Sequence, residues 1–196
     1  MGRAIFLLNS IFQNFDEALK YYIQIPPQNA LTFFWSNHIP LILIYPVSII
    51  ASPIPWIMGK TLTFSKIFFP IFCAVLFLLT AIIYDKITEH QKPPTLADGT
   101  SPVVKNLSLF SHIPVSGCGI FFLFYPTFGY IMLFLAVIYS VTLSVQAQCR
   151  FHRITPARAI AQYINAIIFM VAILLVPLFL INILTTFRIF RGMGIF

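Results

Sequence analysis

Five stretches of the chain are long enough and apolar enough to cross a lipid bilayer. A membrane-crossing helix needs about 20 mostly apolar residues, because the hydrocarbon layer is about 30 Å thick and each helical residue rises about 1.5 Å. The five stretches are residues 39–58, 67–84, 107–124, 128–147 and 164–187. The pattern therefore predicts an all-α fold: a polytopic membrane helical bundle with five transmembrane helices, forming a single membrane domain over residues 1–196.

Prolines set the expected shape of three of these stretches. The first carries no charge but contains four prolines, namely Pro40, Pro46, Pro53 and Pro55. Each interior proline removes a helical hydrogen bond, so we expect residues 39–58 to be kinked and packed against neighbouring helices. In the competing interpretation the chain has four spans, and residues 39–58 fold as a re-entrant pair of half-helices. We expect Pro70 in the first turn of the second span, where its missing donor costs little, and Pro177 to bend the fifth.

The third stretch mixes apolar residues with small and polar ones. These are Ser111, His112, Pro114, Ser116, Gly117, Cys118 and Gly119. Small residues let helices approach closely, and polar side chains in a membrane need partners. We therefore expect this span to contact other helices rather than face lipid on all sides.

The segment before the first span, residues 4–24, has the pattern of an amphipathic helix. Its apolar residues recur at spacings of three and four, at Ile5, Leu8, Phe12, Phe15, Leu19 and Tyr22. One face is too polar to span, so the pattern predicts a helix lying in the membrane interface. Packing of this helix on the protein's own spans is the alternative.

The amino-acid composition is that of a membrane protein. Hydrophobic residues make up 59% of the chain and charged residues 9%, whereas an ordinary soluble domain has about 25% charged residues. These values exclude a soluble globular domain and a disordered chain. The net charge of +7 is thinly scattered, with no basic run to track phosphates, so we expect no nucleic-acid partner.

The distribution of Lys and Arg predicts the orientation in the membrane, because positive loops are retained in the cytoplasm. With five spans, one side holds eight cations: Arg3, Lys20, Lys86, Lys92, Lys105, Arg150, Arg153 and Arg158. The other side holds four: Lys60, Lys66, Arg188 and Arg191. We therefore expect an integral protein of a bacterial inner (plasma) membrane, with a cytoplasmic N-terminus and the C-terminus on the opposite side.

The residues that usually carry chemistry form no recognisable site. The three cysteines make no C-x-x-C pair, and the four histidines fall in four different segments. No Asp, Glu, Lys or Arg is expected deep in any span, which counts against transport by this chain alone. The sequence therefore predicts a protein that is not an enzyme and has no catalytic residue, metal site or cofactor.

Six residues are candidates for helix packing or partner binding: His112, Pro114, Gly117, Gly119, Asn165 and Pro177. We expect His112 to face the bundle interior and bond a neighbouring helix, because a polar group there is costly unless it is satisfied. A role as a proton relay is the alternative for His112.

A short basic cluster and one hydrophilic loop remain. Arg150, Arg153 and Arg158 are candidates for contact with anionic lipid head groups, or they serve only to set the topology. The loop 85–106 carries much of the chain's charge and is expected to be a solvated connector, with docking of a cytoplasmic partner as the alternative.

The order of these pieces resembles the Ypt-interacting-protein (Yip) domain family of small polytopic membrane proteins, especially its bacterial branch. The resemblance extends best over about residues 103–187, with a looser N-terminal half. It rests on Asp16, Glu17, Ala18, Phe110, Pro114, Gly117, Tyr125, Pro126, Tyr139 and the run Ile154, Thr155, Pro156, Ala157, Arg158.

The chain departs from the family pattern at two places. Phe15 follows Asn14 where the family usually has proline, and the acidic Gly-Pro motif linked to small-GTPase interaction is missing. Roles in vesicle trafficking are therefore not implied. The resemblance implies a non-enzymatic membrane protein that acts as an accessory or scaffold through contacts with membrane lipids or with protein partners in the membrane.

Two alternative functions stay open at the level of sequence. One is a subunit of a larger membrane transporter or respiratory complex, whose aromatic-rich spans would pack against other chains. The other is a carrier or channel for a neutral or lipidic substrate, with the first span and His112 lining the path.

Overall fold

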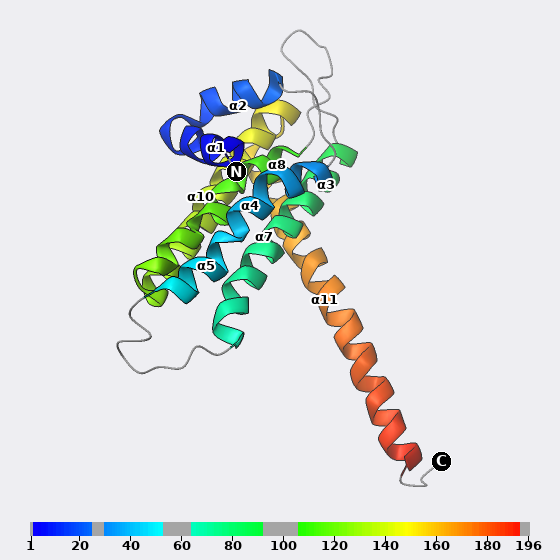
Figure 1. Ribbon diagram of the computed structural model, residues 1–196. Helices are drawn as coiled ribbons and strands as arrows, with labels where there is room; N and C mark the ends of the chain where they lie inside the picture. The colour runs from blue at the N-terminus through cyan, green and yellow to red at the C-terminus, as the bar shows by residue number, and fades with distance from the viewer. Residues whose placement is uncertain (1, 25–29, 53–63, 92–105, 193–196) are drawn as a thin grey trace.

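A computed structural model describes residues 2–24, 30–52, 64–91 and 106–192, and these residues form helices and connecting turns without a strand. The elements in chain order are α1 (Gly2–Gln13), α2 (Phe15–Gln24), α3 (Ala30–Phe33), a π-helical turn η1 (Phe34–His38), α4 (Ile39–Ile42), α5 (Ile44–Ala51), α7 (Phe64–Gln91), α8 (Leu107–Ser111), α9 (Ile113–Gly117), a 3₁₀ helix η2 (Cys118–Leu123), α10 (Pro126–His152) and α11 (Pro156–Gly192). The predicted all-α bundle is confirmed (Figure 1).

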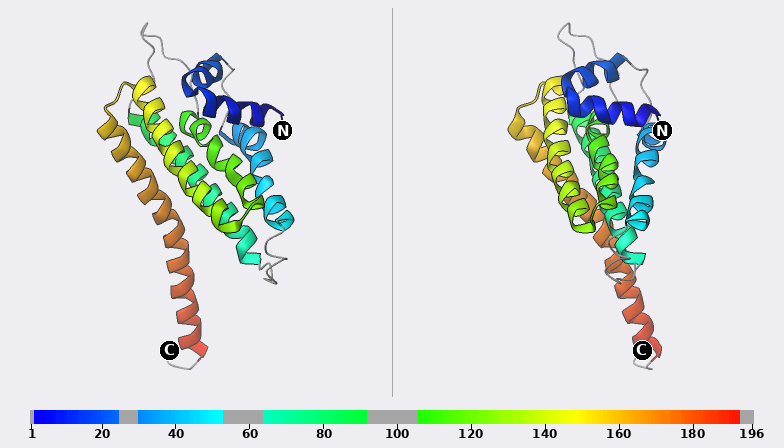
Figure 2. Two further views of the ribbon diagram at one scale, coloured as in Figure 1. Left: turned by 90° about the vertical axis from the view of Figure 1, so that its left-hand side faces the viewer. Right: turned by 60° about the vertical axis from the view of Figure 1, so that its left-hand side comes forward.

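Four helical segments are long and apolar enough to cross a membrane, which makes the chain an integral membrane protein. They are Ala30–Ala51, Phe68–His90, Pro126–His152 and Pro156–Pro177. Ala30–Ala51 and Pro156–Pro177 run in one direction along the bundle, whereas Phe68–His90 and Pro126–His152 run in the other, and the two termini lie at opposite ends (Figures 1 and 2). We call the end that carries α1 and α2 the N-terminal end of the bundle.

The third predicted span, residues 107–124, is not one continuous helix. It consists of α8, α9 and η2, which we call the central segment. Pro114 has no N–H to bond the carbonyl of Phe110, and the chain breaks just before it at His112, whose φ is −92° and ψ is 6°. Every residue from 107 to 119 is buried. Broken helices are tolerated at membrane depth where protein surrounds them, and the other helices surround this one.

The first span begins earlier than predicted, at Ala30 instead of residue 39. The expected interruptions are present: the π-helical turn η1 precedes Pro40, and Leu43 separates α4 from α5. Residues 30–51 run along the bundle in a single direction rather than as a re-entrant pair (Figure 2). Pro53, Pro55 and the rest of the predicted span to residue 58 lie outside the described residues.

Two prolines lie inside helices because α7 and α11 are longer than the predicted spans. Because α7 begins at Phe64, Pro70 lies inside the helix, and the expectation of a first-turn proline was wrong. Pro177 also lies within its helix, and α11 continues past it to Gly192.

The N-terminal segment is two helices, and its buried face differs from the predicted one. Asn14 separates α1 from α2, and its side-chain oxygen accepts a hydrogen bond from the N–H of Glu17 at 3.4 Å, as an N-cap does. In α1 the buried residues are Ala4, Leu7 and Ile11, while three neighbouring apolar side chains, Ile5, Phe6 and Phe12, are exposed. The buried face predicted from the spacing of apolar residues was therefore wrong in α1. The chain breaks at Asn14, so α1 and α2 need not bury the two halves of one continuous helical face.

Both N-terminal helices pack on the bundle. In α2 the predicted residues Leu19 and Tyr22 are buried, and the ring of Tyr22 stacks on Phe110 of α8 with centroids 4.4 Å apart. In α1, Leu8 lies directly over Gly117 of α9. These contacts fix α1 and α2 across the N-terminal end of the bundle.

Candidate functional site

A largely buried polar network at the N-terminal end of the bundle joins α7, α8, α10 and α11. Its first member is Asp85, which the sequence placed in a loop but which lies inside α7. The Asp85 carboxylate accepts hydrogen bonds from the backbone N–H of Ser108 at 2.9 Å and of Leu109 at 3.4 Å. It also accepts one from Nε2 of Gln148 on α10 at 2.6 Å. Asp85 therefore lies near the end of the candidate span Phe68–His90 rather than deep within it.

The geometry explains how an acid is accommodated there. The first N–H groups of a helix have no partner within it, and a carboxylate satisfies them while matching the positive end of the helix dipole. Asp85 therefore attaches α7 to the start of α8. A sequence signal for this exists: an acid just beyond the last apolar residue of a predicted span can turn inward when the helix extends past it.

Ser108 connects Gln148 to His112 within this network. The Ser108 hydroxyl accepts from Nε2 of Gln148 at 2.9 Å, and its carbonyl lies 2.7 Å from Nδ1 of His112. A carbonyl only accepts, so Nδ1 carries the proton, and the Ser144 hydroxyl lies 3.2 Å from the same nitrogen. Nε2 of the neutral ring then accepts from the Tyr163 hydroxyl at 3.0 Å. This pattern connects His112 to α10 and α11 and assigns its tautomer.

Tyr163 begins a second group of contacts between α7 and α11. Its ring meets that of Tyr84 edge to face, with centroids 5.0 Å apart. One turn away, the Thr88 hydroxyl donates to Oε1 of Gln162 at 3.3 Å. These contacts attach the first part of α11 to the bundle.

Two further polar contacts brace the first span against the central segment. Nδ1 of His38 lies 2.7 Å from the Ser116 hydroxyl, and both residues are buried. The Tyr45 hydroxyl donates to the carbonyl of Val115 and lies 2.9 Å from Sγ of Cys118. The polar side chains of the third predicted span therefore face protein.

Two of the candidate glycines are sites of close approach. A Cβ at Gly119 would lie 2.4 Å from the ring of Tyr45, and a Cβ at Gly117 would lie 2.5 Å from a methyl group of Leu8. Real Cβ atoms do not come so close, so each glycine is needed for its neighbour to sit where it does. Pro114 is buried beside them in α9.

The remaining packing candidates do not join this region. Asn165 and Pro177 lie on exposed positions of α11, away from the central segment. The structure thus brings together four of the six candidates, His112, Pro114, Gly117 and Gly119. The members of the site that sequence reasoning missed are Asp85, Ser108, Ser144, Gln148 and Tyr163.

The basic cluster lies at the N-terminal end of the bundle. Arg150 pairs with Asp16 of α2 at 2.9 Å, an exposed pair of the kind that contributes little to stability. Arg153 ends α10 in the left-handed region, with a φ of 49°, and Arg158 is exposed in the first turn of α11. The Arg150 side chain therefore contacts this protein's own N-terminal helix.

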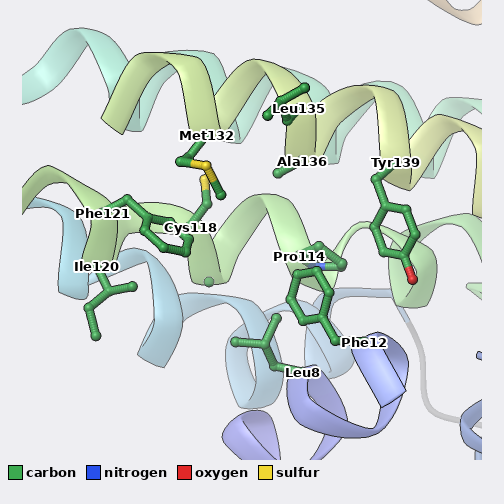
Figure 3. A pocket seen from close by; sticks show the side chains of 11 residues that line it. Leu8, Phe12, Pro114, Cys118, Ile120, Phe121, Met132, Leu135, Ala136 and Tyr139 are labelled. Atoms are coloured by element: carbon green, nitrogen blue, oxygen red, sulfur yellow. The ribbon is translucent and has the colours of Figure 1, made fainter. Parts of the chain in front are cut away.

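An apolar groove of about 420 Å³ lies on the outer side of the bundle. Leu8 and Phe12 of α1 close one end, Gly117 and Phe121 line the central-segment side, and Ala136 lines the α10 side. We call this hollow the α1 groove (Figure 3). His112 and the first span do not line it.

Among the described residues, no group of three or more His, Cys, Asp or Glu is placed to hold a metal ion. Comparison of the chain with known protein families, with curated proteins and with solved structures finds no match. The arrangement of its residues is therefore the guide to the function of this chain.

Proposed function

We propose that this protein is a non-enzymatic accessory or scaffold subunit of the Yip-like type, which recruits an integral membrane partner through the outer part of α11. The observation that carries the proposal is that α11 packs on the bundle along its first part only. Its buried residues include Ala159, Tyr163, Ala166 and Met170, which form one stripe, and no described side chain after Met170 is buried.

The length of α11 supports the same conclusion. Its 37 residues correspond to about 55 Å, compared with a hydrocarbon layer of about 30 Å. The helix leaves the bundle and projects past it on the side opposite α1 (Figure 1). Large apolar side chains, including Phe169, Ile173 and Phe179, are exposed along it. A helix that is apolar all round is covered by lipid or by other helices, and in a long helix clear of its own bundle a partner can pack against every face.

We place the protein in a bacterial inner membrane with the N-terminal end of the bundle in the cytoplasm. The cations in the described ranges support this orientation: the N-terminal end holds Arg3, Lys20, Lys86, Arg150, Arg153 and Arg158, and the opposite end holds Lys66, Arg188 and Arg191. Basic residues near the ends of spans favour the cytoplasmic side.

Site-specific photo-cross-linking tests the proposal. A photoreactive phenylalanine analogue is placed at Phe169 or Phe179 of α11, with Phe134 of α10 as the matched control, since all three are exposed aromatic residues. We expect one integral membrane protein, identified by mass spectrometry, to cross-link from both α11 positions and not from Phe134. The same protein should co-purify in mild detergent at a fixed stoichiometry.

Two outcomes contradict the proposal. One is cross-linking to lipid alone, or to the same set of proteins from Phe134 as from α11. The other is a stable monomer that carries out substrate-dependent transport in liposomes.

A further inference from the structure

We propose that the α1 groove binds one acyl chain of a bilayer phospholipid. This site is separate from the partner surface of α11, so either proposal can fail without the other. The groove lies between the central segment and α10, within the membrane-spanning part of the bundle (Figure 3).

Small residues create the groove. Gly117 and Pro114 on one side and Ala136 on the other leave a hollow that no long side chain of the bundle fills. Towards the far end of the bundle the two walls converge, since a Cβ at Gly129 of α10 would lie 2.5 Å from the ring of Phe122. The groove therefore extends from α1 to the close contact between Gly129 and Phe122.

The lining chemistry suits a hydrocarbon chain. The lining residues carry no charge, and the polar atoms among them are already bonded. The Tyr139 hydroxyl donates to the carbonyl of Ile11 at 3.2 Å, and Sγ of Cys118 contacts the carbonyl of Val115 at 3.2 Å. A polar ligand would find nothing to bond here, whereas a hydrocarbon chain gains dispersion contacts on several sides.

The shape of the groove distinguishes an acyl chain from a partner helix. At its head, Leu8 covers Gly117, and the ring of Phe12 stacks on Tyr139 with centroids 5.6 Å apart and planes 4° apart. A spanning helix with a diameter of about 10–12 Å would have to pass through α1 to continue along this path. A volume of about 420 Å³ falls within the range of about 300–1,000 Å³ of small-ligand pockets. An acyl chain is narrow enough to leave the open side of the groove below α1 towards its head group, whereas a crossing helix is not.

The test uses the full chain in vesicles of phosphatidylethanolamine and phosphatidylglycerol that contain a phosphatidylethanolamine with a diazirine on one acyl chain. After irradiation, the modified residues are located by mass spectrometry of peptides. We expect the adduct yield at Phe121, Met132 and Leu135 to exceed that at Ile167 and Ile168 of α11, which are exposed apolar residues outside the groove, by at least about five-fold.

Groove-filling variants provide the control on location. Ala136→Phe should reduce the groove adducts at least about five-fold and leave the α11 adducts unchanged. Met132→Trp fills the hollow from a less buried position, and it serves if Ala136→Phe does not fold. Ile138→Phe adds the same aromatic ring on α10 outside the groove and should leave every adduct unchanged.

Three results would overturn the proposal. Equal adduct yields inside and outside the groove would show ordinary boundary lipid. Groove adducts that persist in both filled variants would place the chain elsewhere. Cross-links between two copies of this protein through Phe121, without lipid adducts there, would identify a second copy as the occupant.

Discussion

Asp85 holds together three helices by means of one side chain. Its carboxylate satisfies two backbone N–H groups at the start of α8 and the Gln148 amide on α10. Each of these donors would otherwise lose this acceptor in a largely apolar environment, and an unsatisfied buried donor costs about 1–3 kcal/mol. The stability of the N-terminal end of the bundle therefore depends strongly on this residue.

We expect Asp85→Ala to lower the free energy of unfolding by about 3 kcal/mol, because three donors lose this acceptor at once. Glu89→Ala on the same helix is the matched control. It removes only the exposed pair with Lys86 and should change stability by ~0.5 kcal/mol or less. Thermal unfolding in detergent, followed by circular dichroism, measures both. Equal effects of the two substitutions would show that the Asp85 contacts contribute nothing.

The sequence left two roles open for His112, a structural one and a proton relay. In the tautomer that these partners imply, the ring donates to the carbonyl of Ser108 and accepts from the hydroxyl of Tyr163, so both nitrogens have a hydrogen-bond partner. His112 thus bonds a neighbouring helix as the sequence predicted, and its structural role stays a prediction.

The conformation of the central segment depends on the helices that pack against it. The segment is too irregular to be a stable helix by itself, with a break at His112 and a 3₁₀ turn from Cys118 to Leu123. Its neighbours stabilise it: α1 lies on Gly117, and the Tyr45 ring of α5 lies on Gly119. The two glycines should therefore respond differently to the same substitution.

We expect Gly119→Ala to destabilise the bundle by about 1–3 kcal/mol, because the new methyl group meets an aromatic ring whose hydroxyl is bonded to Val115. Gly117→Ala should cost less, since it meets the end of a flexible leucine. Gly2→Ala has open space around it and serves as the control. Unfolding midpoints in detergent should follow this order; a larger effect at Gly117 than at Gly119 would contradict it.

At the scale of the whole molecule, the helices run back and forth so that loops and termini divide between two ends of the bundle (Figure 2). Glu89 and Thr155 are exposed at the N-terminal end, and Phe124 is exposed at the opposite end. With the N-terminal end in the cytoplasm, these positions lie on different sides of the membrane.

We expect a membrane-impermeant maleimide added to intact cells to label a cysteine at Phe124 and not one at Glu89 or Thr155. The variants are Phe124→Cys, Glu89→Cys and Thr155→Cys, each in a chain whose three native cysteines are replaced by serine. Labelling after cell disruption controls for accessibility. The reverse pattern in intact cells would invert the proposed orientation.

The sequence by itself determined the membrane class and the approximate positions of the helices, because hydrocarbon thickness sets the length of any apolar run that crosses it. It also indicated that the span 107–124 would not face lipid on all sides, since its polar and small side chains need protein partners. Helix ends were less predictable: α7 and α11 extend well beyond their apolar cores, which brought Asp85 and Tyr163 into helices.

Only the tertiary structure decided which residues meet. His112 and Tyr163 are 51 residues apart, and Tyr45 and Val115 are 70 apart, so no local pattern specifies either contact. The same holds for the α1 groove, because its lining residues come from α1, the central segment and α10. Its closed end depends on where α1 lies before the break at Asn14. Periodicity describes one helix at a time, whereas a site requires the packing of several.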